Sequence, residues 1–201
     1  DLEKEAIKNA RAAHEKSFRE RKLVPVGSAL LMADAIDDFL KMRQKRLQGL
    51  SKLQGKRGMI SEGASGRGKD VVLTAVLEDA GIKNIEDVGP EWDRKMVYYR
   101  ITASMDYDQM ERIIRQAQRD GSIVIVSEMN VLRSALLEGK LNDVLTGKAE
   151  EGFAFFGTIN SADFSGREKL STALQNRILM QEIDDYPQNE LFKLAKGQAP
   201  A

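Results

Sequence analysis

The chain of 201 residues contains no cysteine and only one histidine, His14. Without cysteine it has no disulfide, no cysteine-ligated zinc site and no thiol nucleophile, and one histidine is too few for a multi-histidine metal site. His14 belongs to a charged N-terminal segment, where we expect an exposed helix with this imidazole in solvent. The absence of cysteine is compatible with a cytoplasmic protein, which is the location that we expect.

An excess of charge of one sign is also missing, because 31 Lys and Arg balance 31 Asp and Glu. Bulk electrostatics therefore gives no argument for a nucleic acid or an anionic membrane as partner. No apolar run reaches the roughly 20 residues that a membrane helix needs, and no secretory signal opens the chain. The first residue is Asp1 rather than Met, so we expect a piece of a longer protein.

A basic run from position 41 to position 57 departs from this balance, with seven positive residues and no acid. Such a run is either a phosphate or nucleic-acid contact or the solvated end of a helix and its linker. No aromatic side chain interleaves with it to stack on bases, which favours the solvated helix end.

The composition, with 42% hydrophobic and 31% charged residues, is typical of a globular domain. Apolar residues recur at helical spacing in residues 28–50, and from residue 57 onward short apolar strands alternate with helices. Strand patterns cover residues 57–62, 96–103, 122–130 and 152–160, and helix patterns cover residues 69–80, 106–120 and 131–147. This alternation predicts an α/β domain of three layers, with a mostly parallel sheet between helices.

The stretch EGASGRGKDVVL, residues 62–73, has the spacing of a phosphate-binding P-loop: Gly63, four residues, Gly68 and Lys69. A strand pattern precedes it and a helix pattern follows it, as the motif requires. Glycines let backbone N–H groups converge on phosphate oxygens, the helix N-terminus adds partial positive charge, and Lys69 reaches the outer phosphates. The alternative is an ordinary strand–turn–helix connection that carries a lysine. The residues expected to bind nucleotide are Gly63, Ala64, Ser65, Gly66, Arg67, Gly68, Lys69, Asp70 and Val71.

A second group of motifs lies in GFAFFGTINSADFSGREKLSTALQNRI, residues 152–178. A strand pattern there ends in Thr-x-Asn and is followed by a Gly-Arg pair and a Leu-Ser-x-Ala-Leu helix with an Asn-Arg. Together with the P-loop pattern, this segment resembles AAA+ ATPases, in particular the dynein, midasin and MoxR-like branch. The sequence NSADFSGR is also similar to McrB-like GTPases of the same superfamily.

The resemblance implies a P-loop NTPase core over residues 25–186, after an N-terminal helical extension over residues 1–24. Residues 187–201 look like only the start of the helical lid, so most of the lid is missing. The resemblance also implies that Glu128 polarises the attacking water, that Asn160 helps to place it, and that Arg177, with Arg167 second, reaches the γ-phosphate of a neighbouring subunit.

At the two positions where these ATPases bind or support magnesium, this sequence has different residues. Asp70 stands where a P-loop has a Ser or Thr on the metal ion, and Ser127 stands where the neighbouring strand of these proteins ends in Asp. A carboxylate at position 70 repels a polyanion unless a cation lies between them. Because the two departures are complementary, we hypothesise a magnesium site in which Asp70 and Ser127 have exchanged roles. The competing interpretation is decay of a site no longer used for hydrolysis.

Two functions are therefore expected as alternatives. The first is a module that binds and hydrolyses ATP, with GTP as the other base, together with Mg²⁺, to drive remodelling in a homo-oligomeric ring or a larger chain. The second is a degenerate module that uses nucleotide structurally or not at all. The retained Lys69, Glu128, Asn160 and Arg177 favour the first function, and the altered Asp70 and Ser127 favour the second.

Overall fold

The computed structural model describes residues 1–21, 27–50, 57–63, 68–102, 104–127, 149–160 and 178–182. Its helices are α1 (Leu2–Glu20), α2 (Gly27–Leu47), α3 (Lys69–Asp79) and α4 (Tyr107–Asp120), with short 3-10 turns at Ile85–Asp87 and Arg94–Met96. Its strands are β1 (Gly58–Gly63), β2 (Lys83–Asn84), β3 (Val97–Ile101), β4 (Ile123–Val126), β5 (Ala154–Asn160) and β6 (Ile178–Glu182). No helix among these residues is both long enough and apolar enough to span a bilayer.

The six strands form one sheet in the order β2-β3-β4-β5-β1-β6, and all pairs between neighbouring strands are parallel. The predicted parallel α/β sheet is thereby confirmed. β1 lies inside the sheet, between β5 and β6, although neither of them is its neighbour in sequence. The chain leaves β1 for the β2 edge and then returns strand by strand. The carboxyl end of β1 is thus at a change of direction in the topology, where ligands of open parallel sheets commonly bind.

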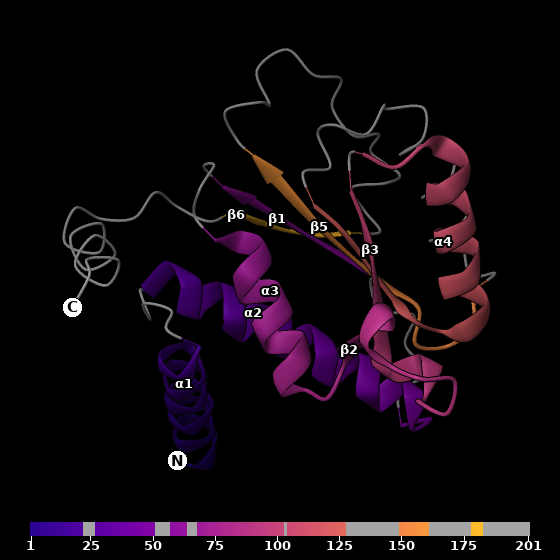
Figure 1. Cartoon of the computed structure of the whole chain (residues 1–201). Coiled ribbons are helices and arrows are strands. Elements are labelled where there is room, and N and C mark those ends of the chain that lie inside the picture. The colour runs from indigo at the N-terminus through magenta and orange to yellow at the C-terminus, as the bar shows by residue number, and fades with distance from the viewer. Residues whose placement is uncertain are drawn as a thin grey trace.

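Helices cover both faces of the sheet, with α2 and α3 on one side and α4 on the other (Figure 1). Strand alternation sorts the side chains between two apolar cores. Phe156 packs with Ile36 and Leu73 on the α2–α3 face, whereas its neighbour Phe155 packs with Ile114 on the α4 face. This division lets any residue of a strand be assigned to a face by its place in the alternation.

The ends of α4 follow the sequence pattern closely. Asp106 caps the helix: its carboxylate accepts from the Gln109 amide at 2.8 Å, and the Gln109 side chain accepts from the Asp106 amide at 3.1 Å. Gly121 ends the helix at φ 69°, and a Cβ there would lie 2.3 Å from the Glu151 carbonyl oxygen. The chain therefore turns from α4 into β4 at a position that only glycine fits.

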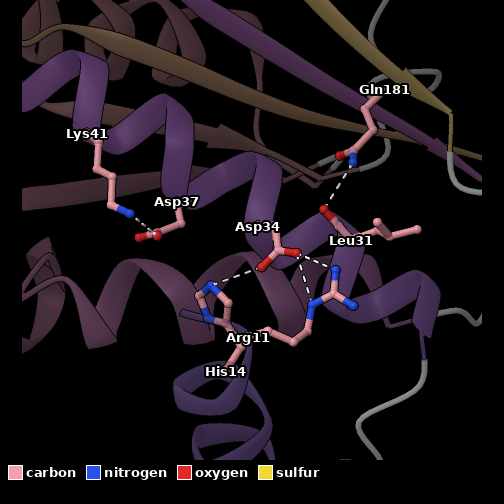
Figure 2. Close-up of polar contacts among 7 residues, drawn as sticks. All are labelled: Arg11, His14, Leu31, Asp34, Asp37, Lys41 and Gln181. Carbon is pink, nitrogen blue, oxygen red and sulfur yellow. Dashed lines mark hydrogen bonds and ion pairs between the residues drawn. The ribbon is translucent and has the colours of Figure 1, made fainter. Parts of the chain in front are cut away.

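The N-terminal helix α1 packs against the domain, and the prediction that His14 is exposed is wrong. His14 is 8% exposed and Phe18 is 1% exposed, because these residues and Ser17 share the face of α1 that turns toward α2 and α3. Figure 2 shows Arg11 and His14 of α1 converging on Asp34 of α2. The Arg11 Nε donates to Asp34 Oδ2 at 3.1 Å, and His14 Nε2 lies 3.6 Å from Asp34 Oδ1.

Replacing Asp34 by alanine is expected to loosen α1 and to lower the free energy of unfolding by about 1–2 kcal/mol, since it removes two contacts of a partly buried carboxylate. Asp37→Ala is the matched control on the same helix, because within the described ranges Asp37 forms its ion pair along α2, with the exposed Lys41 at 3.0 Å. Such exposed pairs are worth about 0.5 kcal/mol. Urea unfolding followed by circular dichroism measures both values; equal losses would show that Asp34 does not hold α1.

Candidate functional site

The junction of β1 and α3 places a lysine at the carboxyl end of a central strand. β1 ends at Gly63, Gly68 caps α3 with φ 69°, and Lys69 is the first residue of the helix. A Cβ on Gly68 would meet no atom within 4 Å, so its left-handed backbone, rather than packing, calls for glycine. Gly68 makes no side-chain hydrogen bond to the helix, unlike Asp106 at the start of α4. The cap of α3 is thus a glycine, and the acid nearest to the helix N-terminus is Asp70 in the first turn.

The Lys69 ammonium folds back across the connection between strand and helix. Its Nζ donates to the Gly63 carbonyl oxygen at 3.1 Å, so the charge lies beside the last residue of β1. The acceptor in this contact is a neutral carbonyl oxygen. An anion that binds at this junction would therefore meet the ammonium and the helix N-terminus together.

A row of polar side chains crosses the α2–α3 face of the sheet next to this junction. Ser61 of β1 is paired in register with Thr158 of β5 and with Gln181 of β6. Val126 is paired with Gly157, so Ser127, the next residue, follows opposite Thr158. Ser61 and Thr158 are each 3% exposed. The apolar core of this face therefore ends in hydroxyl and amide groups at the carboxyl ends of the strands.

Asp70 and Ser127 both belong to this polar edge, and each has a partner there. Thr158 Oγ1 donates to Asp70 Oδ1 at 3.4 Å, which ties the first turn of α3 to β5. Arg100 of β3 donates from its terminal nitrogen to Ser127 Oγ at 2.9 Å. The register and these contacts thus order four side chains along the edge, from Asp70 through Thr158 and Ser127 to Arg100.

Arg100 is a residue of this edge that the sequence patterns did not single out. Burial raises the pKa of its neighbour Tyr98, and the nearby charge of Arg100 opposes that rise. Among the residues that the structure describes, Arg100 makes no ion pair with a carboxylate. The signal that could have revealed it is an arginine inside the apolar strand pattern MVYYRITA, at a position that alternation assigns to a covered face.

These contacts bear on the predicted magnesium site. Its two predicted donors, Asp70 and Ser127, lie on the same polar edge, but a guanidinium already donates to the Ser127 hydroxyl. A divalent ion on that hydroxyl would stand a few ångströms from the positive charge of Arg100 and be repelled by it. The described ranges also hold no cluster of three or more His, Asp or Glu side chains suited to a metal ion. Ser127 therefore fits a divalent cation only if Arg100 moves away.

No protein-family model matches the chain. Asn160 ends β5 directly opposite Gly63 in the register, which puts its backbone beside the start of the predicted P-loop. Val71 follows in the first turn of α3 and is 47% exposed.

The remaining predicted site residues lie outside the described parts of the chain. They are Ala64, Ser65, Gly66 and Arg67 of the P-loop pattern, the water-polarising Glu128, and the two arginine candidates Arg167 and Arg177. The helix pattern at residues 131–147 and the expected start of the lid at residues 187–201 also lie outside them. All of these stay predictions, as do the domain boundaries.

Proposed function

We propose that this chain is a nucleotide-binding module of the AAA+ type, which holds the phosphates of ATP, with GTP as the other base, at the carboxyl end of β1. The observation that carries the proposal is the contact of Lys69 Nζ with the Gly63 carbonyl oxygen, 3.1 Å, at the start of a helix whose cap residue is Gly68. A triphosphate oxygen is a stronger acceptor for an ammonium than a neutral carbonyl is. Binding would therefore exchange this internal contact for a charge-assisted one.

The position of Lys69 relative to the sheet supports the same proposal. The lysine lies where the chain changes direction between β5, β1 and β6, which is the general location of nucleotide sites in open parallel sheets. Asn160, the residue proposed to place an attacking water, ends the strand next to Gly63. In this proposal Glu128 would polarise that water, and Arg177 of one subunit would reach the γ-phosphate held by the next.

A second candidate is binding without turnover. It is favoured by the hydrogen bond from Arg100 to Ser127, because a guanidinium beside this hydroxyl would repel a magnesium ion bound to it. Nucleotide would then stabilise the fold or an assembly, since a ligand that binds only the native state raises its stability.

Calorimetric titration with ATP, joined to phosphate-release and oligomer-size measurements on the same samples, tests the proposal. We expect saturable binding of ATP and no comparable binding of adenosine, because the site recognises phosphate. Release of phosphate by an oligomer would support the remodelling ATPase, and binding without release by an oligomer would support the second candidate. Equal binding of ATP and adenosine, or no binding of either, would refute the phosphate site.

A further inference from the structure

We propose that α1 is a strap that detaches from the α2–α3 face as a unit, and that ionic strength governs its release while the rest of the domain stays folded. Nothing in this device depends on the proposed nucleotide site. Three features of the helix support it: the small apolar surface that it buries, the charges that hold it, and the length of helix that the domain leaves uncovered.

The apolar attachment of α1 is a single side chain. Phe18 belongs to the apolar core of the α2–α3 face, and no other residue of α1, all of which is described, belongs to that core. The other two buried residues of the helix, His14 and Ser17, are polar. Since a docked helix owes its stability mainly to its buried apolar face, α1 should open at a lower free energy than the helices beneath it.

Ion pairs with acids of two helices supply the second part of the attachment. Arg11 donates to Asp34 of α2. Arg21, which follows the last residue of α1, lies 3.0 Å from Asp79 and 3.3 Å from Glu78 of α3. The side chains in these pairs are 27% to 49% exposed. Dissolved ions therefore screen the attraction, which weakens as the salt concentration rises.

These contacts place the strap on the carboxyl end of α3. Asp79 is the last residue of that helix, and it accepts a hydrogen bond from Ser17 besides its ion pair with Arg21. Because α3 begins at Lys69, α1 holds the end of α3 that is opposite the proposed phosphate site. Release of the strap would uncover Asp79 together with the apolar surface that Phe18 covers.

The amino-terminal half of α1 lies beyond the domain. Residues 1–9 are all exposed, and Figure 1 shows this end of the helix pointing away from the sheet. By helical spacing Ile7 lies on the same side of α1 as Phe18, yet it is 60% exposed. The domain thus covers this side of α1 only toward its carboxyl end. A helix held over half its length can leave the α2–α3 face without any change in the sheet.

Hydrogen exchange of the native, whole chain, followed by mass spectrometry at about 50 mM and about 500 mM NaCl, tests the strap. We expect amides of residues 10–20 to exchange faster than those of α2, α3 and α4 at both salt concentrations. Their exchange should be roughly three- to tenfold faster at the higher concentration, the size expected for screening two or three exposed ion pairs. The internal standard is α4, which packs on the other face of the sheet.

Two pairs of variants separate the charges from the apolar anchor. Arg21→Gln should reduce the response to salt, and Arg19→Gln is its matched control, because Arg19 forms its ion pair within α1, 3.8 Å from Glu15. Phe18→Ala should speed the exchange of residues 10–20 by at least roughly tenfold and leave α4 unchanged. Its control, Ile7→Ala, truncates an exposed apolar side chain of the same helix and should leave residues 10–20 unchanged.

Four results would overturn the proposal. If α1 exchanges at the rate of α2 and α3 at both salt concentrations, it opens only with the whole domain. If α1 exchanges faster but does not respond to salt, the charges do not govern its release. Exchange at the rate of an unfolded peptide at low salt would mean that α1 is not docked. Equal effects of Arg21→Gln and Arg19→Gln on the salt response would assign that response to the charges within the helix.

Discussion

Alanine in place of Lys69 is expected to abolish ATP binding, with a loss of at least roughly a hundredfold in affinity. The lysine begins α3 and its ammonium lies at the Gly63 carbonyl, beside the end of β1. Removing it takes away a charge-assisted bond to phosphate, and the acid at position 70 then faces the polyanion with less compensation. Calorimetric titration with ATP, in EDTA and in MgCl₂, measures the loss.

The variant is expected to fold, which keeps this result interpretable. Lys69 is at the end of a helix and partly exposed, and alanine is a better helix former than lysine. Lys83→Ala is the matched control: Lys83 is an exposed lysine near the β2 edge, where its Nζ lies 4.5 Å from the centre of the Trp92 ring. Lys83→Ala should leave ATP affinity unchanged. If Lys69→Ala also retains full affinity, the phosphate site is not at this junction.

The elements that local sequence dictates were predictable. In the segment of α4, Asp106 precedes the helix, Gln109 lies at capping spacing in its first turn and Gly121 follows it, and α4 begins and ends accordingly. The apolar patterns at residues 122–130 and 152–160 contain the strands Ile123–Val126 and Ala154–Asn160. Alternation of such strands with helices predicts parallel pairing because each crossover needs a helix to return the chain. The order of the strands does not follow from local pattern, since it depends on which edges meet after folding.

The residues whose environment the sequence patterns did not predict are polar, and their partners are far away in sequence. His14 reads as a surface residue because α1 is charged and has few apolar positions, yet one face of the helix is covered by α2 and α3. Arg100 is a charged residue within an apolar strand pattern, and the pattern does not indicate its partner Ser127, which is 27 positions later. Long-range hydrogen bonds of this kind leave no periodic trace, so composition and spacing do not reveal them.

The burial of Arg43 is the clearest feature that the sequence did not predict. Replacing this arginine has the largest effect on stability that we expect. Arg43 belongs to the basic run whose favoured interpretation was a solvated helix end, but it is 2% exposed. Its Nε donates to the Gly152 carbonyl at 2.6 Å, and one terminal nitrogen donates to the carbonyls of Gly121, at 3.0 Å, and Lys95. These carbonyls precede β5, β4 and β3, so one guanidinium joins α2 to the amino ends of three neighbouring strands.

A glycine at position 152 leaves room for this guanidinium. Gly152 has φ 98°, and a Cβ there would lie 3.3 Å from the Arg43 terminal nitrogen and 2.8 Å from the Gly121 carbonyl oxygen. Glycine at this position thus provides both the backbone conformation and the space. Burial lowers the pKa of Arg43 to about 10, with the charge of Arg46 adding to the effect, so Arg43 remains protonated at neutral pH.

Arg43→Met is therefore expected to lower the free energy of unfolding by about 3–5 kcal/mol, because it fills much of the same volume but leaves three carbonyls without their donor. Arg43→Lys should lose less, since an ammonium keeps the charge and can serve part of the set. Lys45→Met, an exposed change on the same helix, is the matched control and should stay within about 0.5 kcal/mol. Urea unfolding measures all three. A loss for Arg43→Met as small as that of the control would mean that solvent replaces the guanidinium at these carbonyls, and that the amino ends of β3, β4 and β5 do not depend on it.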